Sequence, residues 1–154
     1  MAKREALREL QSRLAERLQA ALTEVPAASW LAVECAGQGL IFPLQGAGEI
    51  FTAAGLLPVA HTRPWFLGVA NLRGGLHGVV DLAAFLGLRT HRLAVDALGD
   101  QSRLLAFNPT VGSHCAVLVD RLAGLRGAGQ LTRLPDAPGT RPVFAGGIYR
   151  DSGG

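Results

Sequence analysis

The chain has very few of the features that point to nucleic acid. Of its 15 basic residues only Lys3 is a lysine, and the arginines are scattered from Arg4 to Arg150. A protein that follows a phosphate backbone clusters its cations, so a net charge of +3 without a basic stripe argues against such a partner. Aromatic residues make up only 6% of the chain, so platforms for stacking bases are also missing. A small β-barrel that binds single-stranded nucleic acid therefore remains a distant alternative.

Cysteines and long apolar runs are scarce as well. Cys35 and Cys115 are too few for the disulfide framework of a small secreted protein, and we expect buried thiols. The N-terminus is charged where a signal peptide would be apolar, and no run is long enough to span a bilayer. We therefore expect a cytoplasmic protein without membrane insertion.

No catalytic or metal-binding pattern stands out. His114 and Cys115 are adjacent in an expected strand, so their side chains point to opposite faces and cannot form a dyad. The other histidines are isolated in the sequence, without metal-site spacing: His61, His77 and His91. The "GAGEIF" stretch at 46–51 lacks the third glycine of a dinucleotide-binding loop. We expect no enzyme, no cofactor and no metal.

What the chain does have is a pattern of short apolar runs separated by glycine and proline. Its 154 residues are 49% hydrophobic and include 20 glycines and 8 prolines. Eight runs read as strands, without the repeated helices that a doubly wound fold needs. They are "WLAVEC", "GQGLIFPL", "GEIF", "PWFLGVANL", "LHGVVDL", "RLLAF", "HCAVLVDRLAGL" and "VFAGGIYR". The sequence thus predicts a mostly β barrel or pair of barrels, with a loop over 124–139.

The first residues differ from the rest. Between Ala2 and Glu24, leucines recur at steps of three and four, which predicts an amphipathic helix; they are Leu7, Leu10, Leu14, Leu18 and Leu22. Pro26 ends this segment. The helix either packs on the body of its own protein, the favoured interpretation, or docks on a partner or starts a coiled coil. We place a helix and connector at 1–27 and the main domain at 28–154.

The stretch "GVANLRGGLHGVVDLAAFLGL" at 68–88 puts polar residues into an apolar run. We predict a hairpin with a three-residue loop, Arg73-Gly74-Gly75, which makes Leu72 face Leu76. This register separates an apolar inner face from a half-polar outer face. The inner set is Ala70, Leu72, Leu76, Gly78, Val80 and Leu82, and the outer set is Val69, Asn71, His77, Val79 and Asp81.

A short helix follows this hairpin. Asp81 can cap a helix over Leu82 to Leu86, and Gly87 can supply the left-handed stop. Capping is the favoured role for Asp81. For Asn71, the structural alternative to partner contact is to satisfy the turn.

The order of these motifs resembles the CheW-like domain, the coupling protein of bacterial chemotaxis arrays. The matching motifs are "GEI" at 48–50, "LPV" at 57–59, "NLRG" at 71–74, "GVVDL" at 78–82, "LLAF" at 104–107 and "CAVLVDRLAGL" at 115–125. The resemblance covers about Trp30 to Tyr149. It implies two small SH3-like β-barrel subdomains around a shared core, with the first helix attached outside.

The same resemblance implies a non-catalytic adaptor. Such a protein couples the cytoplasmic tip of methyl-accepting chemoreceptors to the regulatory domain of a CheA-like histidine kinase. Carried over residue by residue, the implied partner-binding positions are Glu49, Asn71, Arg73, Gly74, Val79 and Asp81. An exposed arginine beside an apolar surface suits such a contact, because its guanidinium is a directional, bidentate donor.

Two features are more similar to the PilI-type member that serves type IV pilus twitching motility. One is Gly78, where many coupling proteins have a proline, and the other is the longer leading helix. Family members continue past a hairpin that corresponds to "GIYRDSGG" at 147–154, into one more strand and usually a closing helix. We therefore expect that the domain lacks these last elements here, which would leave an open β edge.

Overall fold

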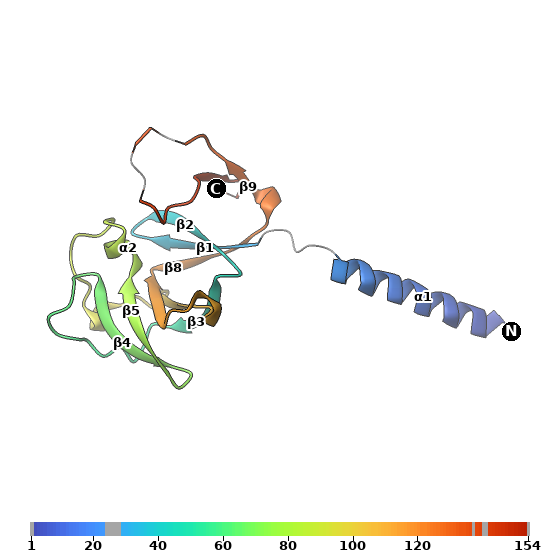
Figure 1. Ribbon diagram of the computed structural model, residues 1–154, viewed down its shortest axis with the longest axis horizontal. Coiled ribbons are helices and arrows are strands. Elements are labelled where there is room, and N and C mark those ends of the chain that lie inside the picture. Colours follow the sequence, from blue (N-terminus) through green and yellow to red (C-terminus); the bar gives the residue numbers. More distant parts are fainter. Residues whose placement is uncertain (1, 24–28, 137, 140–141, 154) are drawn as a thin grey trace.

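The computed structural model describes residues 2–23, 29–136, 138–139 and 142–153, and these fold into a mostly β protein (Figure 1). The helices are α1 (Ala2–Thr23) and α2 (Leu82–Phe85). The first strands are β1 (Trp30–Cys35), β2 (Gln38–Pro43), β3 (Ala47–Thr52), β4 (Phe66–Leu72) and β5 (Gly75–Asp81). The later strands are β6 (Arg103–Phe107), β7 (Cys115–Val119), β8 (Arg121–Arg126), β9 (Leu131–Arg133) and β10 (Tyr149–Asp151). Three short 3₁₀ helices cover Val95–Ala97, Pro109–Val111 and Ala128–Gln130.

Five strands form one curled sheet in the order β3-β6-β7-β5-β4, and only the β5–β7 pair is parallel. The chain before β4 closes onto it, because Leu57 and Val69 exchange backbone hydrogen bonds of 2.8 and 2.9 Å. Gly68 permits this approach: a Cβ at that position would lie 2.1 Å from the Leu57 carbonyl oxygen. The enclosed core includes Leu67, Leu72, Val79, Leu104 and Leu118.

A second core lies between this sheet and a three-stranded sheet of order β2-β1-β8. It combines β1 residues with both helix α2 and the middle strands β6 and β7, for example Val33, Leu82, Leu105 and Val117. Strands β6 and β7 send alternate side chains into the two cores, which explains why "RLLAF" and "CAVLV" are almost continuously apolar. The two halves therefore share the middle strands.

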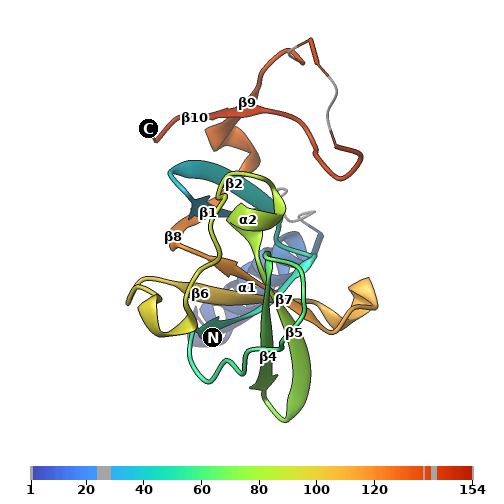
Figure 2. The same ribbon diagram turned by 90° about the vertical axis from the view of Figure 1, so that its left-hand side faces the viewer.

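Strands β9 and β10 form a separate two-stranded sheet. Seen from the side, this C-terminal segment lies at one end of the molecule, and the β4–β5 hairpin projects at the other (Figure 2). The predicted loop over 124–139 is partly wrong, because it contains the end of β8 and all of β9. The predicted strand "VFAGGIYR" is shorter than expected, since only Tyr149 onward pairs. A turn covers Val143 and Phe144, and residues 145–148 have no regular secondary structure.

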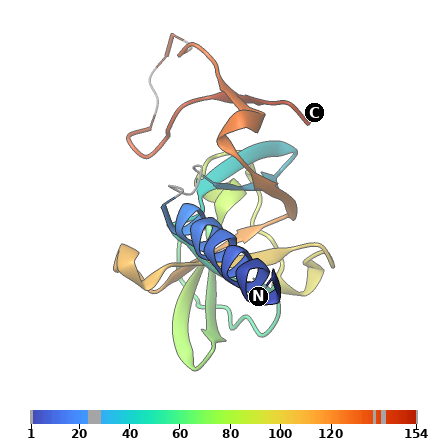
Figure 3. The same ribbon diagram turned by 90° about the vertical axis from the view of Figure 1, so that its right-hand side faces the viewer.

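Helix α1 forms as the leucine spacing predicts, but the structure does not show it packed on the body. Leu10 and Leu14 are 64% and 60% exposed. The helix stands apart from the strands in Figure 1, and Figure 3 views it nearly end-on, in front of them. No helix in the described part of the chain is long and apolar enough to cross a membrane.

Candidate partner-binding surface

An exposed ion pair joins two of the residues that the sequence singled out. The guanidinium of Arg73 contacts the carboxylate of Glu49, and their side chains are 76% and 42% exposed. Glu49 lies in β3 and Arg73 in the β4–β5 turn, at the two edges of the five-stranded sheet. The contact therefore connects the two edges of the five-stranded sheet. Because both side chains are exposed, the pair contributes only about 0–1 kcal/mol to stability.

The local backbone sets the direction of both side chains. The register of β3 against β6 shifts between Ala47 and Ile50, which leaves one extra residue in β3 next to Glu49. Such a bulge bends the strand and re-aims a side chain. Gly48 allows the bulge, because a Cβ there would lie 2.7 Å from the Ala106 carbonyl oxygen. The β3 bulge thus directs the Glu49 side chain toward Arg73.

The hairpin loop has two residues, Arg73 and Gly74, with φ values of +49° and +80°. Strand β4 ends opposite the start of β5, where Leu72 pairs with Gly75. The side-chain oxygen of Asn71 accepts a hydrogen bond of 2.9 Å from the Gly74 N–H. Asn71 therefore satisfies the turn, which was one of its two predicted roles. An arginine in the left-handed region costs roughly 1 kcal/mol.

The predicted three-residue loop is wrong, and the error of one residue turns β5 over. Val79 and Asp81, predicted on the outer face, are 0% and 1% exposed. Leu76, predicted inside, is 65% exposed. Val79 packs in the barrel core with Leu72 and Ala70. Neither Val79 nor Asp81 can therefore present its side chain to a partner in this conformation, while Glu49, Asn71, Arg73 and Gly74 lie at or near the surface.

The favoured structural role of Asp81 is confirmed. Its carboxylate accepts a hydrogen bond of 3.4 Å from the Ala84 N–H at the start of α2. Gly87, with φ of +75°, takes the left-handed conformation expected after the helix.

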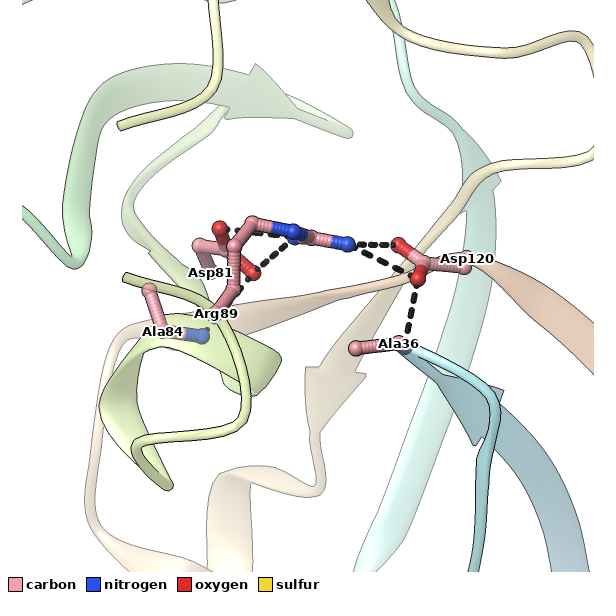
Figure 4. A network of polar contacts seen from close by, with 5 residues as sticks. All are labelled: Ala36, Asp81, Ala84, Arg89 and Asp120. Atoms are coloured by element: carbon pink, nitrogen blue, oxygen red, sulfur yellow. Dashed lines mark hydrogen bonds and ion pairs between the residues drawn. The ribbon is translucent and has the colours of Figure 1, made fainter. Parts of the chain in front are cut away.

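Arg89, which sequence reasoning missed, connects the buried carboxylate of Asp81 to the half-buried carboxylate of Asp120 (Figure 4). One guanidinium nitrogen donates to Asp81 at 2.7 and 2.8 Å, and another donates to Asp120 at 2.9 and 2.8 Å. Asp120 also accepts from the Ala36 N–H at 2.7 Å. The cluster thus links the end of β5 to the β1–β2 and β7–β8 turns. Val-Asp occurs at 80–81 and 119–120 but also at 95–96, so this dipeptide alone could not identify the cluster.

Electrostatics keep Arg89 charged. Burial disfavours the charged form, but hydrogen bonds to Asp120 and Asp81 outweigh it and raise the pKa of Arg89. In a second, half-buried pair, the hydrogen bond of 2.6 Å that Arg126 donates to Asp151 lowers the pKa of Asp151.

A broad groove lies on the other side of the molecule. It has a volume of about 1350 Å³ and lies between the three-stranded sheet, helix α2 and the C-terminal segment. Phe85 and Phe144 stand at it with ring centroids 5.7 Å apart, and both are exposed. This face combines apolar area with few unpaired charges.

The sequence indicated isolated histidines, but two of them meet in the folded protein. The rings of His77 and His114 meet edge to face, with centroids 5.8 Å apart. No cluster of three or more metal-ligating side chains occurs within residues 2–23, 29–136, 138–139 and 142–153.

Comparison with known proteins identifies the family to which this fold belongs. The profile described as CheW-like domain matches residues 29–148. The chain belongs to the CheW-like domain family. Among solved structures, the scaffolding protein TtCheW from Thermoanaerobacter tengcongensis is similar in fold, with a TM-score of 0.65 and 16% identity over 80% of this chain and 82% of that one. Comparison with curated proteins gave no match. The CheW-like region thus includes the three-stranded and five-stranded sheets, the ion pair and the Arg89 cluster, and it begins after helix α1.

Proposed function

We propose that this chain is a non-catalytic scaffold that couples methyl-accepting chemoreceptors to a CheA-like histidine kinase in the cytoplasm. The observation that carries the proposal is the exposed Arg73–Glu49 pair, held on a hairpin turn and a strand bulge of a CheW-like domain. The side chain of Arg73 is 76% exposed, which supports a role in partner contact. The proposed contact residues are Arg73, Glu49, Asn71 and Gly74, the last two through the shape of the turn.

Two properties of Arg73 support this role: its backbone conformation is unfavourable, and its ion pair stabilises the fold only weakly. The residue occupies a left-handed position that suits glycine or asparagine better, and its ion pair is largely solvated. A residue with these properties contributes little to folding. Recognition by a partner is the role that such an exposed, directed arginine can still perform.

The test is isothermal titration of the full chain into the regulatory domain of the CheA-like kinase and into a chemoreceptor tip from the same genome. Wild type is expected to bind at least one of them saturably. Arg73→Ala is expected to weaken that binding about tenfold or more while the far-ultraviolet spectrum stays unchanged. Unchanged affinity in the folded variant, or no wild-type binding to either partner, contradicts the proposal.

Two controls sharpen this experiment. Arg121→Ala removes another exposed arginine that pairs with a glutamate, Glu34, on the three-stranded sheet, and it should leave the Arg73-dependent binding unchanged. The double variant Arg73→Glu with Glu49→Arg restores an ion pair with reversed charges. If the partner recognises the arginine itself, this swap does not restore binding; recovery of full affinity would assign the pair a purely structural role.

We further propose that the chain serves a PilI-type, type IV pilus system. Gly78 supports this assignment, because its N–H donates to the His114 carbonyl at 3.0 Å, a bond that the proline of many coupling proteins could not make. Helix α1 also supports this assignment. We propose that it forms a unit with its connector at 1–27, outside the domain at 28–154. Deletion of the gene should reduce twitching and spare flagellar swimming; the reverse result contradicts this assignment.

A further inference from the structure

Two histidines that are 37 positions apart in the sequence share one face of the five-stranded sheet. His77 lies in β5, and His114 directly precedes β7, the parallel neighbour of β5. The Gly78 N–H donates to the His114 carbonyl at 3.0 Å, which fixes the two backbones next to each other. The imidazole rings meet with centroids 5.8 Å apart and planes at 68°.

The ring of His77 is oriented by its own strand. Its Nδ1 lies 3.0 Å from the carbonyl oxygen of Gly75. A carbonyl can only accept, so Nδ1 carries the proton and the neutral ring keeps its lone pair on Nε2. Gly75 leaves room for this arrangement, because a Cβ there would lie 3.2 Å from the His77 ring. Metal-binding histidines are typically held in this way, with one nitrogen donating to a backbone carbonyl and the other facing the metal.

We propose that His77 and His114 form a binding site for a divalent transition cation such as Zn²⁺ or Ni²⁺. Imidazole nitrogens suit these cations, and a cation about 2.0–2.1 Å from one nitrogen of each ring is compatible with the observed centroid separation. His114 is exposed and His77 half-buried, so water completes the coordination. The site is separate from the proposed coupling function, and each can fail without the other.

The experiment is calorimetric titration of the untagged full chain with ZnCl₂ near neutral pH, where the rings can bind as neutral ligands. Wild type is expected to bind one cation. His77→Gln and His114→Gln should each weaken binding about tenfold or more, since even loss of an outer hydrogen-bond partner lowers metal affinity by roughly 10–100-fold. Glutamine keeps a polar side chain of similar reach, and circular dichroism confirms that each variant is folded.

Matched controls are His61→Gln and His91→Gln, which remove exposed histidines elsewhere, and Cys115→Ser, which removes the neighbouring thiol. All three should retain wild-type affinity. Ni²⁺ supplies an independent readout, because its paramagnetism should broaden the ring proton signals of His77 and His114 before those of His61 and His91. Equal affinity in wild type and both pair variants, or a loss caused equally by a control variant, overturns the proposal.

Discussion

Arg89 and Asp81 form a doubly hydrogen-bonded ion pair at 2.7 and 2.8 Å, with side chains that are 10% and 1% exposed. The same guanidinium reaches Asp120, so one cation faces two carboxylates. The pair therefore holds the five-stranded sheet and the turns of the three-stranded sheet in one arrangement. A charge buried this deeply is tolerated only while its partners are in place.

Replacing Arg89 with methionine should strongly destabilise the protein. Arg89→Met keeps much of the volume but leaves Asp81 buried without a cation and next to Asp120. We expect the free energy of unfolding to fall by about 3–5 kcal/mol. Equilibrium unfolding in urea, followed by circular dichroism, measures the change.

The matched control is Arg121→Met, because Arg121 also donates to a carboxylate, that of Glu34, but at the surface. Its loss should change the free energy of unfolding by no more than about 1 kcal/mol. Equal losses in the two variants would show that burial does not govern the strength of the Arg89 cluster.

Much of the β architecture could be predicted because its strands are bounded by clear signals. "WLAVEC" and "RLLAF" coincide with β1 and β6, since both are apolar runs between turn residues. Asp81 and Gly87 mark the two ends of α2 by local capping chemistry, which needs no knowledge of the rest of the fold.

The register of β5 could not be predicted, because Gly74 and Gly75 are both able to adopt a positive φ. A loop of two residues and a loop of three are then equally compatible with the sequence, and the choice between them decides which face of β5 is buried. The Arg89 cluster and the His77–His114 contact depend on strands that meet only in the folded protein. From composition and spacing alone, Arg89 and Asp120 are indistinguishable from surface charges, and His77 and His114 from isolated histidines.

The observed register makes a sharp mutational prediction. Leu72 is buried in the barrel core, whereas Leu76, its expected neighbour on the inner face, is 65% exposed. Leu72→Asp should prevent folding, because an unpaired carboxylate in an apolar core costs several kcal/mol. Leu76→Asp should change the free energy of unfolding by about 0.5 kcal/mol or less. Thermal unfolding of both variants provides the measurement, and similar damage from the two would support the three-residue loop instead.

The thiol of Cys35 should make stability fall at alkaline pH. Burial, with smaller contributions from Asp120 and Asp81, raises the pKa of Cys35 from 9.0 to about 11. The folded protein then keeps a proton that the unfolded chain releases, so this stabilisation is complete below about pH 9 and is lost as pH rises through about 11. Urea unfolding of wild type and Cys35→Ala across this range isolates the effect, because other groups titrate in both chains. The stability advantage of wild type should shrink between about pH 9 and 11, because in that range the unfolded wild-type chain releases the thiol proton while the folded protein still holds it. A difference that stays constant with pH would mean that the thiol titrates alike in the folded and unfolded chains.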